Sequence, residues 1–117
     1  MLPKQYRLKN RYAFKATYKI RNSSHSGGVT LFVGKLKNDD SPTRVGFVVS
    51  KKVHKRAVKR NRLKRLMRES YRLLLKNNDL GNSQKYMSLI FVGSEHALSK
   101  NFDEIDSSIK LLIRGIK

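Results

Sequence analysis

The segment between residues 51 and 76 constrains the fold of this chain more than any other segment. Its apolar residues recur at i, i+3 and i+4, which is the spacing of one face of an α-helix. The pattern predicts a long helix over residues 57–77, with a buried stripe made of Leu63, Leu66, Met67, Ser70, Leu73 and Leu74. Other parts of the chain must cover this stripe, and a length of 117 residues allows that within one domain spanning residues 1–117.

The rest of the predicted helix carries a high density of positive charge. Residues 51–76 contain twelve Lys or Arg residues and one acid, Glu69. Arg60, Lys64 and Arg68 follow one another at intervals of four, a spacing at which like charges destabilise a helix by about 0.2–0.5 kcal/mol per pair. A face that is only solvated would normally intersperse acids among its bases. The pattern therefore indicates a polyanionic partner, and the guanidinium groups favour phosphate, which they bind with two parallel hydrogen bonds.

The formal net charge of +19 is divided into two blocks along the chain. Residues 1–21 carry +7 and residues 51–76 carry +11, whereas residues 22–50 carry +1 and residues 77–117 are neutral. Nucleic acid is the partner that this balance favours, because each neutralised phosphate releases condensed counterions. An anionic membrane surface is the weaker alternative. The chain has no run of about 18 apolar residues, so the sequence predicts no membrane-spanning helix.

Three segments read as strands. Residues 29–36 alternate, with Val29, Leu31 and Val33 on one face and Thr30 and Phe32 on the other; residues 44–50 alternate in the same way. We expect these two strands to pair as an antiparallel hairpin. Residues 86–92 are apolar at nearly every position, which predicts a central strand buried on both faces.

Two further helices are expected at the ends of the chain. Residues 10–21 place Phe14 and Tyr18 four positions apart, on one helical face. Asn101 and Glu104 have the spacing of a capping box and precede a full apolar stripe, which predicts the start of the last helix. Together the segments predict helices packed on a small sheet.

The sequence contains no recognisable catalytic machinery. It has no cysteine, and its three histidines are far apart, without a nearby carboxylate pattern. No glycine-rich loop has the spacing of a phosphate-binding motif. The acids Asp103, Glu104 and Asp106 lie where they complement the dipole of the last helix. We therefore expect no catalytic side chain, no protein metal site and no small-molecule substrate, and the lack of cysteine fits a cytoplasmic location.

Two stretches resemble the signature of the bacterial ribonuclease P protein component. Residues 44–52 read Arg-Val-Gly-Phe-Val-Val-Ser-Lys-Lys, and after Ala57 residues 60–69 read Arg-Asn-Arg-Leu-Lys-Arg-Leu-Met-Arg-Glu. The Arg-Asn-Arg run is the hallmark of that family, and the resemblance extends over essentially the whole chain. It implies an α+β fold, a single-domain α/β sandwich of order αβββαβα with a small mixed sheet. It also implies one additional strand around residues 22–27 and a left-handed βαβ crossover, where the general rule predicts a right-handed one.

The resemblance also implies a function. Members of this family are the protein subunit of an RNA-catalysed endoribonuclease that removes the 5′ leader of precursor tRNA, with Mg²⁺ held by the RNA and substrate. The implied partners are the catalytic RNA and precursor tRNA, and the implied effects are a lower Mg²⁺ requirement and a preference for precursor over mature tRNA. The residues that the resemblance assigns to the catalytic RNA are Lys51, Lys52, Arg56, Arg60, Asn61, Arg62, Lys64, Arg65 and Arg68.

A second set is assigned to the single-stranded leader. Phe14 and Tyr18 match the aromatic cleft positions of the family, with Lys15 beside them. The family often has another aromatic residue on the first long strand, where the alignment gives Lys35 here; a lysine would replace stacking with a phosphate contact. Aromatic rings in a positive groove bind single strands of many sequences. The alternative for Phe14 and Tyr18 is that they form the core face of their helix.

Other functions stay open at this point. A ribosomal or other structural RNA-binding protein fits the composition, and such a protein need not prefer a precursor with a leader. A nucleoid-type DNA-binding protein would place the basic helix in a major groove. A protein-only nuclease would need clustered carboxylates for Mg²⁺, and the acids of the last helix are the sole candidates.

Overall fold

The computed structural model describes residues 2–117. Its elements follow the order αβββαβα, which confirms the predicted fold class. Three short 3₁₀ helices, Lys4–Tyr6, Gly81–Lys85 and Glu95–Ala97, lie between or before the main elements. The main elements are α1 (Arg11–Lys19), β1 (Asn22–Ser26), β2 (Val29–Val33), β3 (Arg44–Val48), α2 (Ala57–Lys76), β4 (Ser88–Gly93) and α3 (Phe102–Arg114).

The four strands form one mixed sheet in the order β1-β2-β4-β3. β2 pairs with β1 and β4 in antiparallel orientation, and β3 pairs with β4 in parallel. The predicted hairpin between the second and third strands is therefore wrong, because β4 lies between them. The physical reason is burial: β4 is apolar on both faces and takes the centre of the sheet, where both faces are covered.

The hairpin of this fold is formed by β1 and β2 instead. Gly27 and Gly28 connect the two strands with φ of +57° and +87°, a left-handed conformation that glycine adopts without steric cost. β1 occupies the place where the resemblance implied an additional strand. Its sequence, Asn-Ser-Ser-His-Ser, has no apolar alternation, because it is an edge strand that is mostly exposed.

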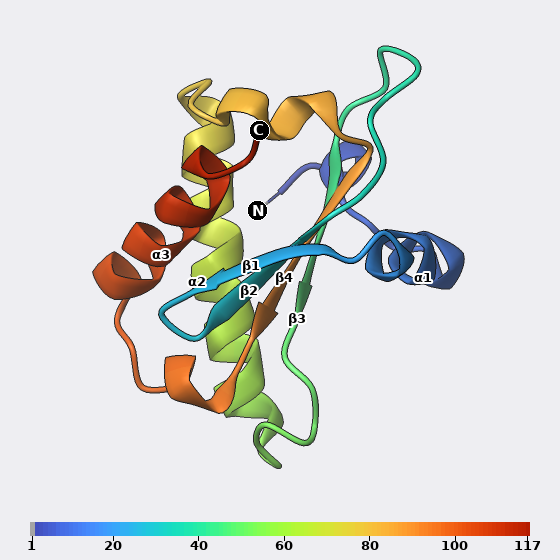
Figure 1. Ribbon diagram of the computed structural model, residues 1–117. Helices are drawn as coiled ribbons and strands as arrows, with labels where there is room; N and C mark the ends of the chain where they lie inside the picture. The colour runs from blue at the N-terminus through green and yellow to red at the C-terminus, as the bar shows by residue number, and fades with distance from the viewer. Residues whose placement is uncertain (1) are drawn as a thin grey trace.

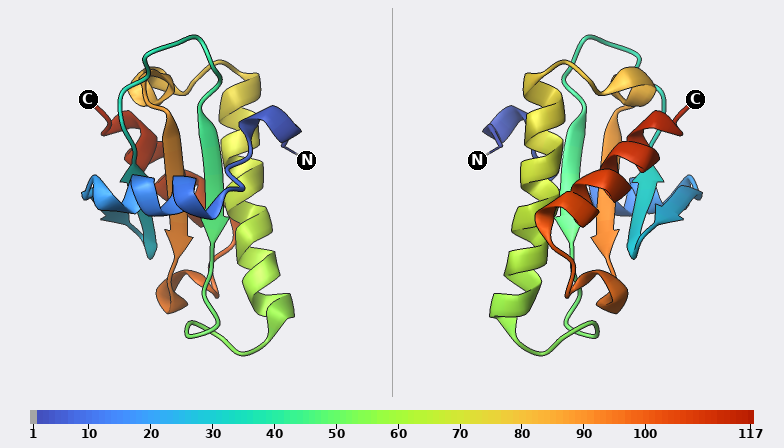
Figure 2. Two further views of the ribbon diagram at one scale, coloured as in Figure 1. Left: turned by 90° about the vertical axis from the view of Figure 1, so that its right-hand side faces the viewer. Right: turned by 90° about the vertical axis from the view of Figure 1, so that its left-hand side faces the viewer.

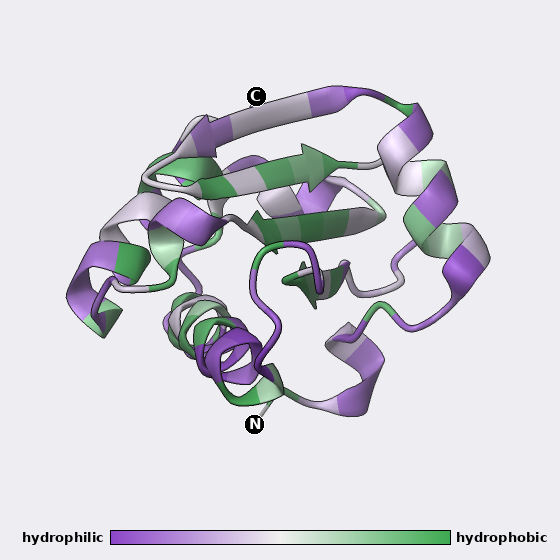
Figure 3. Ribbon diagram, turned by 90° about the horizontal axis from the view of Figure 1, so that it is seen from below, coloured by the Kyte–Doolittle hydropathy of each residue, from purple (hydrophilic) through white to green (hydrophobic). Residues whose placement is uncertain are grey.

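The sheet separates two layers of helices. Figures 1 and 2 show α2 and α3 covering one face and α1 crossing the other. The core lies on the α2–α3 side, where Leu31, Phe91 and Phe47 stand in register across three strands. Figure 3, which views the molecule from below, colours most of β2 and β4 green for hydrophobic residues. The handedness of the β3–α2–β4 crossover stays a prediction of the resemblance.

The helix ends follow the predicted chemistry. The Asn101 side chain accepts a hydrogen bond from the Glu104 N–H, and the Glu104 carboxylate accepts one from the Asn101 N–H, so the capping box is confirmed. Asn10 caps α1 by accepting from the Tyr12 N–H at 2.8 Å. Among residues 2–117, no helix has the length and hydropathy needed to span a bilayer.

Candidate nucleic-acid interface

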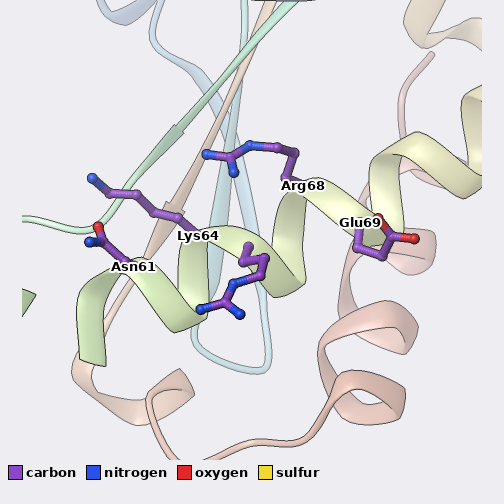
Figure 4. A pocket seen from close by; sticks show the side chains of 5 residues that line it. Asn61, Lys64, Arg68 and Glu69 are labelled. Carbon is purple, nitrogen blue, oxygen red and sulfur yellow. The ribbon is translucent and has the colours of Figure 1, made fainter. Parts of the chain in front are cut away.

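The basic surface of α2 is built on a helix whose other side is fully packed. Leu63, Met67 and Tyr71 are 0% exposed and anchor α2 on the sheet and on α3. The residues between these anchors project from the opposite side. They border an open hollow of about 410 Å³, lined by Asn61, Lys64, Arg65, Arg68 and Glu69. Figure 4 shows Asn61, Lys64 and Arg68 on one side of α2, with Glu69 pointing away from them.

The two arginines of the Arg-Asn-Arg run have structural partners. Arg60 donates from Nη1 to the carbonyl oxygens of His54 and Lys55, at 2.7 and 2.8 Å. Arg62 donates to the carbonyl oxygens of Leu98 and Lys100, both at 3.1 Å. These guanidinium groups therefore tie two loops to α2.

Glu69 does not neutralise the basic surface. Arg72 donates to both of its carboxylate oxygens, at 3.0 and 2.7 Å, one turn farther along the helix. This hydrogen bonding lowers the pKa of the Glu69 carboxyl, so the acid stays ionised and paired. Lys64, Arg65 and Arg68 take part in no ion pair within residues 2–117. Their charges remain available to an external anion.

The start of α2 adds further positive charge. Lys51 and Lys52 lie exposed in the turn that follows β3, and Arg56 is the N-cap residue. The first turn of α2 has no acid. The partial positive charge of the helix N-terminus therefore adds to that of the side chains.

The second group of expected site residues lies on the other side of the sheet. The ring of Phe14 sits over Gly46, where an added Cβ would approach within 2.6 Å of the ring. Tyr18 packs edge-on against Phe32, with ring centroids 4.8 Å apart. Partial burial raises the pKa of the Tyr18 hydroxyl, which stays protonated at neutral pH. Phe14, Tyr18 and Phe32 are all half-buried, so part of each ring remains open to solvent.

The sheet beside these rings is not covered by α1. Val48, Val92, Thr30 and His25 form a row across all four strands, by the register of the three strand pairs. The first three are half-buried and His25 is exposed. The neighbouring residue Ile90, by contrast, is 0% exposed. This row of two valines, one threonine and one histidine lies beside the aromatic side of α1, and together they form a surface of mixed apolar and polar character.

Arg68 connects the two regions. Besides lining the hollow on α2, it borders a smaller hollow of about 160 Å³ that also contains Phe14, Gly46 and Lys9. Its guanidinium carbon lies 6.0 Å from the centre of the Phe47 ring. A nucleic acid on the basic surface of α2 and one on the aromatic surface would therefore be neighbours.

The two lysines expected to contact the leader, Lys15 and Lys35, lie on different sides of α1. Lys15 is exposed on α1, between Phe14 and Tyr18 in sequence. Lys35 follows β2 and borders a separate hollow together with Ala13 and Thr17, on the other side of α1 from the aromatic rings. The structure thus does not bring Lys35 together with Phe14 and Tyr18.

The strand aromatic beside Tyr18 is Phe32, which sequence reasoning did not assign to the site. The signal was present in the strand alternation, which put Phe32 on the face opposite Leu31. That alternation could not show that α1 would cross this face and bring Tyr18 to the ring.

Comparisons with known proteins identify the family. The family model described as Ribonuclease P matches residues 2–117. The chain is 38% identical to the ribonuclease P protein component of Clostridium kluyveri over 109 residues, covering 93% of this chain and 92% of that protein. It is 34% identical to the corresponding protein of a Synechococcus strain, with coverages of 97% and 84%.

The chain belongs to the ribonuclease P protein family.

It is thus the protein subunit of an endoribonuclease of tRNA processing. The fold agrees with this membership. The Staphylococcus aureus RNase P protein superposes with a TM-score of 0.77 at 25% identity, over 95% of this chain and 94% of that one. The Thermotoga maritima protein has the same fold, with a TM-score of 0.77 at 22% identity and coverages of 95% and 100%.

Ribonuclease P enzymes are in general Mg²⁺-dependent, and the side chains of residues 2–117 do not form a cluster of metal ligands. Within residues 2–117, no group of three His, Cys, Asp or Glu side chains could hold an ion. Two of the three acids in α3 have other partners. Glu104 is part of the capping box, and Asp106 accepts from the Ser70 hydroxyl at 2.7 Å and pairs with Lys110 at 2.9 Å.

Proposed function

We propose that this subunit binds the catalytic RNA of ribonuclease P with the basic surface of α2 and the 5′ leader of precursor tRNA with the aromatic surface beside α1. The observation that carries the proposal is the position of Arg68, which borders both surfaces. The leader continues directly from the cleavage site in the substrate, so a subunit serving both RNAs needs its two surfaces side by side.

The catalytic RNA is assigned to the solvent-facing cations of α2. Lys64, Arg65 and Arg68 point outward from a packed helix and have no internal counter-ion among residues 2–117. Lys51, Lys52 and Arg56 extend the same charge around the helix start. Arg60 and Arg62 contribute charge, but their hydrogen bonds to loop carbonyls give them the additional role of shaping this surface.

The leader is assigned to the three half-buried rings. Phe14, Tyr18 and Phe32 border an open stretch of sheet, and base stacking on aromatic rings contributes about 1–3 kcal/mol per base without regard to sequence. Lys15 supplies a cation on the same helix. Phe32 takes the place of the strand aromatic that the family resemblance implied, in preference to Lys35.

Two consequences follow from the charge of +19. A subunit between ribozyme and leader reduces the repulsion between the two RNAs, so less Mg²⁺ is needed for the same affinity. Mature tRNA lacks the leader, so the subunit favours precursor over product. We place this activity in the cytoplasm, and Mg²⁺ at ligands supplied by RNA.

The test is cleavage of a precursor tRNA at low Mg²⁺ by a bacterial ribonuclease P RNA, with and without this protein. We expect cleavage with RNA plus protein, and none with protein alone. Lys64→Ala/Arg65→Ala should weaken binding to the catalytic RNA, whereas the charge-matched control Lys76→Ala/Arg114→Ala, at the ends of α2 and α3, should not. Equal losses in the two double variants would contradict the assignment of α2.

A second pair of variants tests the leader surface. Tyr18→Leu and Phe32→Leu keep apolar bulk but remove a stacking face. Each should weaken precursor binding about 5- to 150-fold, which corresponds to about 1–3 kcal/mol, without changing the affinity for mature tRNA. A loss of equal size for precursor and mature tRNA would show that these rings serve the core alone.

A further inference from the structure

A hollow of about 410 Å³ lies on the side of α1 that faces away from Phe14 and Tyr18. Ala13, Ala16 and Thr17 of α1 form one wall, and the segments that contain Lys35, Arg44 and Met87 form the others. None of these residues belongs to the aromatic surface or to the basic surface of α2. The hollow is therefore distinct from the aromatic surface, although Leu8 also borders the smaller hollow beside Phe14. Figure 2 shows α1 crossing this face of the sheet.

The walls of this hollow are held by the backbone. The N–H of Gly34 donates to the Ser88 carbonyl at 2.9 Å, that of Met87 to the Lys35 carbonyl at 2.7 Å, and that of Arg44 to the Met87 carbonyl at 3.1 Å. The Thr17 and Ser88 hydroxyls are hydrogen-bonded at 2.5 Å and join α1 to β4. The cavity is thus present before a ligand binds, which lowers the entropic cost of binding.

The lining combines two kinds of chemistry. Lys35 and Arg44 are exposed cations, they take part in no ion pair within residues 2–117, and no acid lines the hollow. Ala13 and Ala16 offer a smooth apolar wall, and the Met87 side chain is 47% exposed, with a polarisable thioether that contacts aromatic rings favourably. A ligand that satisfies both must carry an anionic group beside a flat apolar one.

We propose that this hollow binds one unpaired nucleotide of RNA, with its phosphate on Lys35 and Arg44 and its base against Ala13, Ala16 and Met87. The volume is within the range of small-ligand sites. An inorganic anion would use the cations but leave the apolar wall in water, and a purely apolar ligand would leave both cations unused. The proposal relies on the proposed function only for the source of the nucleotide.

Titration of the full-length protein with adenosine 5′-monophosphate, followed by backbone amide NMR, tests the site directly. We expect saturable shifts at Thr17, Gly34 and Ser88, and much smaller ones with inorganic phosphate. Lys35→Ala/Arg44→Ala should weaken this binding about a hundredfold or more, since each of the two charge-assisted hydrogen bonds lost corresponds to at least about tenfold. The Lys76→Ala/Arg114→Ala control should bind as the unaltered protein does.

Two results would overturn the proposal. One is an equal response to phosphate and to the nucleotide, which would reduce the site to an anion site. The other is a set of shifts confined to the aromatic surface around Phe32. Ala16→Phe supplies a second variant, which fills the hollow without removing charge and should block the nucleotide. Amide spectra of all variants report whether they remain folded.

The holoenzyme identifies the source of the nucleotide. We would measure how tightly the holoenzyme with Lys35→Ala/Arg44→Ala binds two precursors, one with a long leader and one with a leader of a single nucleotide. The affinity of the same variant for the catalytic RNA would be measured beside them. A loss of affinity confined to the long leader assigns the nucleotide to the leader, and a loss of catalytic-RNA binding assigns it to that RNA. If the variant binds both the precursors and the catalytic RNA as tightly as the unaltered protein does, the proposal is overturned. If the unaltered protein fails to promote cleavage, the proposed function is overturned instead. The nucleotide titration does not depend on cleavage, so the two failures can be told apart.

Discussion

The Arg62→Ala substitution removes two hydrogen bonds that hold the segment before α3 against α2. The Arg62 guanidinium donates to the carbonyl oxygens of Leu98 and Lys100, both at 3.1 Å. A hydrogen bond that involves a charged group contributes about 1.5–3 kcal/mol, and the half-buried position of Arg62 favours the low end of that range. With two such bonds, we expect the free energy of unfolding to fall by about 3 kcal/mol, and Tm by about 12 °C, since about 1 kcal/mol shifts the Tm of such a domain by about 4 °C.

The matched control is Arg65→Ala. It removes the same charge from the same helix, but Arg65 is exposed and its side chain makes no hydrogen bond within residues 2–117. Its Tm should stay within about 2 °C of that of the unaltered protein, since surface changes usually cost less than about 0.5 kcal/mol. Its affinity for catalytic RNA should fall.

Thermal unfolding by circular dichroism and RNA binding by filter retention, measured on both variants, separate the two roles. Arg62→Lys keeps the charge but cannot reach two carbonyls in the same way, so its Tm should lie between those of Arg62→Ala and the unaltered protein. Equal Tm values for Arg62→Ala and Arg65→Ala would refute the reasoning, because they would show that the bonds of Arg62 add nothing to stability.

Three further predictions concern single positions. Gly46→Ala should displace α1, because the new Cβ would lie 2.6 Å from the Phe14 ring. The affinity of the protein for the leader should drop, while its affinity for the catalytic RNA is kept. An unchanged affinity for the leader would contradict this. Burial raises the pKa of Tyr71 to about 12, above its unfolded value near 10. The stability contributed by this hydroxyl should therefore be full below pH 10 and fall by about 1.4 kcal/mol per pH unit from there to about pH 12. Chemical denaturation across this window should show a smaller loss of stability in Tyr71→Phe than in the unaltered protein, because only the contribution of the Tyr18 hydroxyl, whose pKa is also raised by burial, then remains; an equal loss in both proteins would contradict this. Asn101→Ala removes the acceptor for the Glu104 N–H and should lower the unfolding free energy by about 1 kcal/mol, read as Tm; an unchanged Tm would show that water replaces the cap.

Local pattern was enough to predict the elements that have strong periodicity. The predicted helix over residues 57–77 is α2, Ala57–Lys76, because an apolar stripe beside a run of bases is a property of consecutive residues. The apolar run at residues 86–92 correctly predicted the buried strand β4, Ser88–Gly93. The polar edge strand β1 could be placed only through the family resemblance, because no residue pattern marks it.

The neighbours of each strand could not be predicted in the same way. Residues 29–36 and 44–50 are consecutive strands in sequence, and a hairpin between them satisfies their alternation. In the structure β4 separates them, although it follows 40 residues after the end of β3. The choice depends on which strand is best buried at the centre, which is a property of the whole sheet.

Consecutive residues were enough to establish the chemistry of this protein: a packed helix with an unbalanced basic face, two aromatic residues on one face of the first helix, and a family resemblance carried jointly by residues 44–52 and 60–69. Contacts between distant segments set which of these groups are free to act. They turned Arg60 and Arg62 toward loop carbonyls, brought Phe32 to Tyr18, and placed Lys35 on the far side of α1. The physical reason is that charge and periodicity belong to consecutive residues, whereas the carbonyl or ring that a side chain meets is set by segments distant in the chain.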